Sequence, residues 1–211
     1  MSRSLLFSLC LALPALFSVP LHAAAPAAPA DDPQVAAAYA ADQRERADLA
    51  KQTSKDALRS FAERLATADA ARRRVVMDAL RDGRLRSAAD YRHAATVMQH
   101  GQAADDYALA HALATMGSAL APDDRDLRWL AAAATDRWLL AHRQPQWYGT
   151  QPVCDARADP PVCRLDVAEG AVDDAARTAA GIAPLAELEA QADARARQLG
   201  EQLRGAKAAA R

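Results

Sequence analysis

The sequence predicts a mainly α-helical fold: a single-domain helical bundle with a short disulfide-tied β-hairpin near the C-terminal third. Alanine supplies 57 of the 211 residues, whereas there are only one Ile and nine Val, so intrinsic propensity favours helices over strands. Apolar residues recur at three- and four-residue spacing between capping residues. Cys154 and Cys163 flank a Pro-Pro turn that suits a hairpin. The length is sufficient for one domain with a hydrophobic core.

The first 25 residues have the features of a secretory signal peptide. One early arginine precedes an apolar run of 15 residues, from Leu5 to Val19, and small residues follow up to Ala25. That run is shorter than the roughly 20 residues that span a bilayer as a helix. We therefore expect cleavage after this segment, a flexible leader over 26–31, and a periplasmic or secreted protein without a stable membrane anchor.

The charge balance excludes one class of partner. The chain has 26 Lys and Arg against 27 Asp and Glu, a net charge of −1. Proteins that follow a phosphate backbone need an excess of basic side chains. We therefore expect no nucleic acid partner.

Capping residues place the first two helices. Asp32 before Pro33 is an N-cap signal, and the helix that starts there is expected to break near residues 53–54. A second helix is expected to begin after Thr67 and to end at Gly83, because a glycine in the left-handed conformation commonly terminates a helix.

Three further helices are expected in the middle of the chain, over 87–101, from Asp105 to 120, and from Asp123 or Asp124 to about 140. The last of them is apolar almost all round, which predicts a buried central helix with Trp129 and Trp138 in the core.

The C-terminal third reads differently. An irregular stretch and the two cysteine-bearing arms precede a short helix over 173–180 and a last helix from Pro184. The helical domain is thus expected to span 32–204, with a frayed tail over 205–211.

Export makes a disulfide the expected state of Cys154 and Cys163, since they remain as an even pair in an oxidising compartment. Two cysteines without a nearby histidine lack the ligand count of a structural zinc site. The histidines of the chain have no carboxylate at the spacing of metal ligands, so we expect neither a metal nor a cofactor. The run 72–74 of three arginines is expected to be a solvated face that pairs with Asp69 and Asp78.

Asp136 interrupts the apolar face of the predicted fifth helix. It shares that face with Trp129 and Leu140 by three- and four-residue spacing. A buried carboxylate without a partner is costly, and Arg137 points about 100° away around the helix. We therefore expect the partner of Asp136 to come from another element.

Two more helices carry polar residues in apolar positions. Asp42 and Arg46 are four residues apart on the face of Tyr39, and we expect an ion pair within an apolar stripe. Gln99 and His100 lie in the last turn of the third helix, where a histidine can also bond exposed carbonyls.

A loop rich in hydrogen-bonding groups follows the fifth helix. Its sequence is Gln146-Trp147-Tyr148-Gly149-Thr150-Gln151, so two amides, a phenol and a hydroxyl surround one glycine. Gly149 is expected to serve a positive φ or a close backbone approach. The loop lies near Asp136 and Arg137 along the chain, so folding back onto them has little entropic cost.

Together these residues resemble a bacterial protein family of unknown function. The shared features are Asp42-Gln43-x-x-Arg46, Asp69, Gln99-His100, Asp136-Arg137 and Gln146-x-Tyr148-Gly149-Thr150-Gln151. The resemblance covers roughly residues 31–188, and the combination of QH, DR and Q-x-YGTQ signatures is specific. Many members carry Asn where this chain has Arg72, so the resemblance implies no shared role for Arg72. It implies a domain but no accepted activity.

Three interpretations of these residues stay open. In the first, Asp136, Arg137, Gln99 and His100 form a sealed structural network that holds the loop against the bundle, in an inhibitor-like protein that binds an envelope protein.

In the second, which we favour, the residues line a polar pocket that binds a small or peptide-like ligand. Amides would match peptide, sugar or amide groups, arginines would hold a carboxylate, and aromatic rings would supply stacking surface. The ligand-binding set is Asp42, Gln43, Arg46, Gln99, Arg137, Gln146, Tyr148, Gly149, Thr150 and Gln151, with Trp147 as a further stacking surface.

In the third, the protein is a hydrolase or acyl-transfer enzyme acting on a cell-envelope substrate. His100 would be the general base and Asp136 would orient it. Arg137 or Gln151 would stabilise an oxyanion, and Thr150 or Tyr148 would be the nucleophile or acid. Against it, the chain has no nucleophile-elbow serine, no H-E-x-x-H and no Gly-rich phosphate loop.

Overall fold

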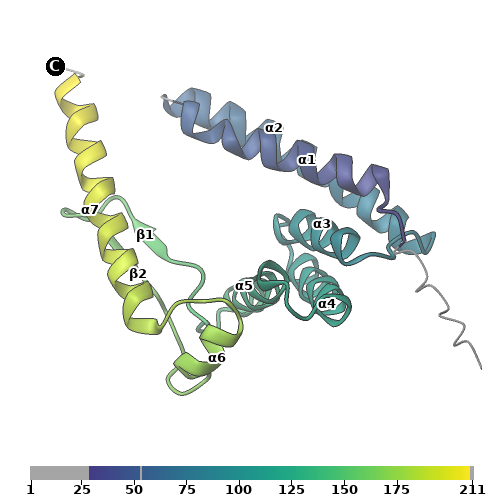
Figure 1. Ribbon diagram of the computed structural model, residues 1–211. Coiled ribbons are helices and arrows are strands. Elements are labelled where there is room, and N and C mark those ends of the chain that lie inside the picture. The colour runs from purple at the N-terminus through teal and green to yellow at the C-terminus, as the bar shows by residue number, and fades with distance from the viewer. Residues whose placement is uncertain (1–28, 53, 210–211) are drawn as a thin grey trace, which may run out of the picture.

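A computed structural model describes residues 29–52 and 54–209, and it is mainly helical with one small antiparallel hairpin, as Figure 1 shows. The expected fold class is therefore confirmed. The predicted signal peptide, 1–25, lies outside the described residues, and of the predicted leader only 29–31 lie inside. Within the described part, no helix is both long and apolar enough to cross a bilayer.

Two helices that lie side by side form the N-terminal layer (Figure 1). α1 (Pro33–Ala47) begins at the predicted cap Asp32, and η1 (Leu49–Lys51) connects it to α2 (Lys55–Arg81). The break between them lies close to the predicted position. The expected helix start after Thr67 is wrong, because its hydroxyl donates to a carbonyl of the preceding turn within one continuous helix.

Three shorter helices pack next to this layer: α3 (Ala88–Gln99), α4 (Ala104–Leu120) and α5 (Arg125–Ala141). Ser87 and Asp90 form a capping box at the start of α3. The main hydrophobic core joins all five helices and is filled by small and β-branched residues. Its members include Val35, Val76, Ala94, Ala95, Val97, Met98, Ala110, Leu113, Ala114, Leu130 and Ala134.

α5 is less buried than the sequence indicates. Leu127, Leu130 and Asp136 lie on its buried side, but Trp129 and Trp138 are 40% and 39% exposed. Their expected place in the core is therefore wrong. The small alanine side chains of α5 fill the core side, and the large indoles lie on the outer side.

The C-terminal third forms a second, smaller packing unit. β1 (Val153–Asp155) and β2 (Val162–Arg164) pair as a hairpin, α6 (Asp174–Ala179) follows, and α7 (Leu185–Ala209) packs against β2. The buried members of its hydrophobic cluster are Cys163, Ala192 and Ala196, a much smaller set than the main core. α7 continues beyond residue 204, into the segment that we expected to fray.

The expected disulfide is present and ties the hairpin. Cys154 lies opposite Cys163 in the antiparallel register, and the two are bonded across nine residues of sequence. Cys163 also contributes to the small core beneath α7. The cross-link therefore couples the pairing of the strands to the packing of the last helix.

We expect the double variant Cys154→Ser/Cys163→Ser to lower the opening free energy of residues 153–209 by about 2 kcal/mol, since a short cross-linked loop restricts the unfolded chain. Hydrogen exchange measured by mass spectrometry on α7 peptides reports this change. The reduced wild-type protein is the matched control and should exchange like the variant. Unchanged exchange in α7 would contradict the prediction.

Candidate functional site

The structure groups the predicted polar residues into two clusters rather than one. The Asp136 cluster contains Asp136, Gln146, Thr150, Gln151 and Arg177 with the backbone of the 146–151 loop. The Arg46 cluster contains Asp42, Gln43, Arg46, Asp69, Arg72 and His100. Among the described residues, no hydrogen bond joins His100 to Asp136.

The Asp136 carboxylate binds the loop through its backbone. One oxygen accepts from the N–H groups of Trp147 and Tyr148, both at 2.9 Å. The other accepts from the N–H and the hydroxyl of Thr150, both at 2.8 Å. The carboxylate is completely buried, so four donors from another element replace its water shell, as the sequence led us to expect.

Gln146 and Gly149 complete the shape of the loop. The fully buried Gln146 amide accepts from the Gln151 N–H at 2.8 Å and donates to the Gln151 carbonyl at 3.0 Å. Gly149 has a φ of +83°, and a Cβ there would lie 3.2 Å from a methyl of Val167. Positive φ and close approach, both foreseen as reasons for a glycine, occur together.

Arg177 is a member of this cluster that the sequence reading missed. Its guanidinium donates to the carbonyls of Trp147 and Tyr148 at 3.1 Å and 3.2 Å, and to Val172 at 3.1 Å. Asp136 therefore binds the N–H groups of a peptide segment whose carbonyls Arg177 binds. An arginine in a six-residue helix gives no pattern that would have identified it.

The Asp136 cluster is thus saturated by its own loop. Every oxygen of the carboxylate has two donors, and both ends of the Gln146 amide are used. The structural interpretation describes these residues best, because a ligand would have to displace bonds that already exist.

The Arg46 cluster is built around the buried carboxylate of Asp42, which has the expected ion pair with Arg46. Arg46 Nε lies 3.1 Å from Asp42 Oδ1, and its Nη2 lies 2.7 Å from Asp69 Oδ2. Gln43 donates to the second oxygen of Asp42 at 2.8 Å. Although burial raises the pKa of Asp42, the hydrogen bond and charge of His100, with Arg46 and Gln43, hold that pKa below its ordinary value.

Arg72 belongs to this cluster, contrary to the expectation of a solvated face. Its side chain is 7% exposed, bonds Asp69 at 2.8 Å and pairs with Glu45. The pairing with Asp69, three residues earlier on α2, was expected. The guanidinium nevertheless lies inward between α1 and α2, because Arg72 also pairs with Glu45 of α1. Asp69 is therefore shared between Arg46 and Arg72.

His100 ends α3 against this cluster. Its Nδ1 lies 3.0 Å from Asp42 Oδ1 and 2.9 Å from Arg46 Nε. A proton on Nδ1 would be donated to Asp42; without it Nδ1 accepts from Arg46. In both cases Nδ1 is engaged, while Nε2 has no hydrogen-bond partner among the described residues. The ring is 18% exposed.

Arg137, which is half-buried, lacks the partners that the buried Arg72 and Arg177 have. No ion pair or hydrogen bond of its guanidinium is present within the described residues, and its Nε is buried without a partner. Burial lowers the pKa of Arg137, and the nearby charge of Arg46 lowers it further, against an opposing effect of Tyr107. Gln99, just before His100, likewise has a buried Oε1 without a partner.

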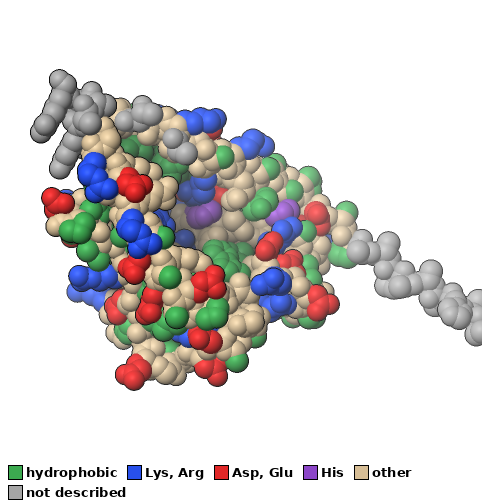
Figure 2. Space-filling model, turned by 60° about the vertical axis from the view of Figure 1, so that its left-hand side comes forward, with side chains coloured by type: hydrophobic (Ala, Val, Ile, Leu, Met, Phe, Trp, Pro, Cys, Tyr) green, Lys and Arg blue, Asp and Glu red, His purple; other side chains and the backbone are tan. Residues whose placement is uncertain are grey.

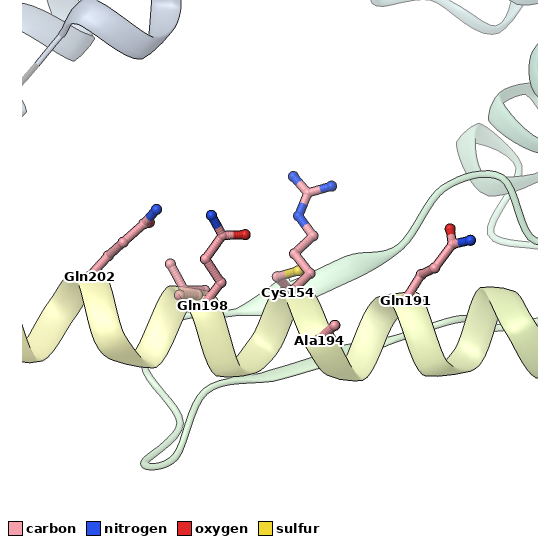
Figure 3. A pocket seen from close by; sticks show the side chains of 7 residues that line it. Cys154, Gln191, Ala194, Gln198 and Gln202 are labelled. Atoms are coloured by element: carbon pink, nitrogen blue, oxygen red, sulfur yellow. The ribbon is translucent and has the colours of Figure 1, made fainter.

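Figure 2 shows that one face of the molecule is hollowed, with histidine and Lys or Arg side chains inside the hollow. A cavity of about 650 Å³ lies along α7 and contains none of the predicted ligand-binding residues. Gln191, Gln198 and Gln202 point to the same side of α7 there (Figure 3). This cavity is large but exposes no buried unpaired group, so the Arg46 cluster with Arg137 is the stronger candidate.

The described residues contain no group of three or more His, Cys, Asp and Glu arranged to hold a metal ion. The chain matches no protein-family model, and no curated protein or solved structure shows significant similarity to it. The family resemblance carried by the QH, DR and Q-x-YGTQ signatures stays an expectation.

We expect Asp136→Asn to lower the unfolding free energy by about 3 kcal/mol. The asparagine amide keeps only one acceptor oxygen, and its NH₂ group would face donors that bond the second oxygen of Asp136. Asp126→Asn on the exposed side of the same helix is the control and should change stability by less than about 0.5 kcal/mol. Urea unfolding followed by circular dichroism measures both. Equal midpoints for the two variants would refute the structural role.

The lowered pKa of Asp42 predicts how stability depends on pH. A carboxyl whose pKa is lower in the folded state stabilises the protein above its ordinary value of 3.8, and this contribution is lost as the pH falls through the folded-state value. Asp32 and Asp90 act in the same direction, since backbone N–H groups that bond each carboxylate lower its pKa despite burial.

We therefore expect unfolding free energy to decline steadily below about pH 4, and Asp42→Asn to flatten the decline. The exposed Asp123→Asn is the control and should keep the wild-type slope. Denaturant titrations between pH 2 and 7 provide the measurement. If the unfolding free energy of Asp42→Asn declined with falling pH as steeply as that of the wild type, Asp42 would not contribute to the pH dependence of stability.

Proposed function

We propose that the Arg46 cluster and Arg137 bind a small or peptide-like ligand through its carboxylate. The observation that supports this is the guanidinium of Arg137, which is half-buried, has a fully buried Nε and has no partner among the described residues. A guanidinium that loses part of its water shell without gaining a hydrogen-bond partner destabilises the folded protein. Such an arrangement is explained when an anionic ligand supplies the missing partner.

The charges around Arg137 favour a carboxylate over a cation. Arg46 is near enough for its charge to lower the pKa of Arg137, and the carboxylates of Asp42 and Asp69 are already paired with Arg46, Arg72 and His100. A planar guanidinium binds a carboxylate through two parallel N–H bonds. The site therefore offers unused donors and no unused carboxylate.

Gln99 suggests the second feature of the ligand. Its side-chain oxygen is buried without a partner, and Gln99 directly precedes His100 at the end of α3. An amide N–H would satisfy that oxygen. A carboxylate next to an amide N–H is the chemistry of a peptide C-terminus or an N-acylated amino acid.

This proposal includes export of the protein through its predicted signal peptide. A periplasmic or secreted location would bring the site into contact with peptides of the cell envelope.

The proposed ligand-binding set is narrower than the set expected from the sequence. It consists of Arg46, Gln99, His100 and Arg137, with Asp42 and Gln43 as supports. Gln146, Gly149, Thr150 and Gln151 belong instead to the saturated loop.

A second candidate function, hydrolysis, has one observation in its favour. His100 Nδ1 lies 3.0 Å from the buried carboxylate of Asp42, an arrangement that can orient an imidazole for proton transfer. The free Nε2 would then be the general base. In this version Asp42, rather than Asp136, would position the histidine, and a bound carboxylate would anchor the substrate beside it.

We expect acetyl-alanyl-alanine to raise the melting temperature of the wild-type protein, and its C-terminal amide to have no effect. Arg137→Met should abolish the shift while raising the unfolding free energy of the ligand-free protein by about 1 kcal/mol, because it removes an unpaired buried charge. Arg74→Met on the exposed face of α2 is the control and should leave both quantities unchanged. Thermal scans with and without peptide measure them.

A loss of stability in Arg137→Met would contradict the proposal, since it would assign Arg137 a purely structural role. An equal shift with the amide would exclude recognition of a carboxylate. Mass spectrometry of the same mixtures tests hydrolysis: cleaved peptide with the wild type and intact peptide with His100→Gln would favour the second candidate.

A further inference from the structure

The three tryptophans of the chain are all unusually accessible. Trp129, Trp138 and Trp147 are 40%, 39% and 45% exposed, although an indole is among the side chains that gain most from burial. Two of them, Trp138 on α5 and Trp147 in the loop that follows, line the same cavity. Neither belongs to the Arg46 cluster.

This cavity, of about 290 Å³, lies between α4, α5 and the loop, and its lining is Ala108, His111, Thr135, Trp138 and Trp147. None of these residues carries a permanent charge. The volume is just below the range of about 300–1,000 Å³ typical of drug-sized ligands. It suits a neutral ligand the size of a single ring.

His111 supplies one hydrogen-bond acceptor at this cavity. Its Nδ1 lies 3.1 Å from the Ala131 carbonyl and 3.1 Å from the Thr135 hydroxyl, and that hydroxyl donates to the same carbonyl at 2.9 Å. Since the carbonyl only accepts and the hydroxyl proton is already used, Nδ1 carries the ring proton. Nε2 of the neutral ring is then an acceptor, and it has no partner among the described residues.

The backbone that carries each of the two indoles is held by hydrogen bonds. The backbone N–H of Trp147 donates to the Asp136 carboxylate at 2.9 Å, and the backbone carbonyl of Trp147 accepts from Arg177 at 3.1 Å. Trp138 contacts the ring of His142, with centroids 4.4 Å apart, and His142 Nδ1 lies 2.8 Å from the Trp138 carbonyl. An exposed aromatic residue on a rigid backbone loses little conformational entropy when a ligand stacks on it.

We propose that this cavity binds one pyranose ring of a neutral saccharide. The C–H bonds on one face of a pyranose are weakly positive and match the negative face of an indole, and a ring hydroxyl can donate to His111 Nε2. A quaternary ammonium would also stack on indoles, but the lining provides no carboxylate to balance its charge. A purely apolar segment would leave the His111 acceptor unpaired.

The test is calorimetric titration of the full chain with three neutral trisaccharides: maltotriose, cellotriose and tri-N-acetylchitotriose. We expect at least one to bind the wild type with a millimolar or tighter dissociation constant. Trp138→Ala and Trp147→Ala should each weaken it about tenfold or more. Trp129→Ala, an equally exposed tryptophan outside this cavity, is the matched control and should bind like the wild type.

Three further measurements keep the outcome unambiguous. Circular dichroism checks that each variant is folded, and Trp147→Phe, which keeps an aromatic face, should retain part of the affinity. His111→Phe should weaken binding through loss of the acceptor. Absence of binding by all three sugars, equal binding by the alanine variants, tighter binding of tetramethylammonium, or a monomer–dimer equilibrium that Trp147→Ala abolishes would each overturn the proposal.

Discussion

The four hydrogen bonds of the Asp136 carboxylate are the interaction on which the C-terminal half of the structure depends. They turn the chain back after α5 and fix the backbone of residues 147–150. The loop is held in turn by Arg177 and by the bridge between Gln146 and Val167. A fully buried charge is tolerated because the loop donors that surround it are polar groups that themselves need hydrogen-bond acceptors.

α5 also separates the two polar clusters, because adjacent residues on a helix point about 100° apart. Asp136 bonds the loop, while Arg137 is close enough to Arg46 for the two charges to interact. The two adjacent side chains therefore lie in different hydrogen-bonding environments. The carboxylate has all the partners that it can use, and the guanidinium has none among the described residues. That contrast is the basis for proposing a ligand role for Arg137 and a structural role for Asp136.

Helical periodicity, capping residues and export-dependent cysteine pairing were sufficient to predict the helical fold, the hairpin and its disulfide, since these depend on local sequence. The pairing of Asp42 with Arg46 followed from four-residue spacing. The pairing of Asp42 with His100 did not, because residues 58 positions apart meet only through the packing of α1 on α3. Arg177 was missed for the same reason, as its bonds to the 146–151 loop join residues about 30 positions apart.

The uneven division of apolar contacts has a consequence for dynamics. The five N-terminal helices share one extensive core, whereas α7 rests on a few small side chains and the cross-linked hairpin. Cooperative units of unequal stability open independently. We therefore expect the last helix to open at a lower free energy than the remaining bundle, so the glutamine-lined side of α7 should be the wall of the molecule that moves most easily.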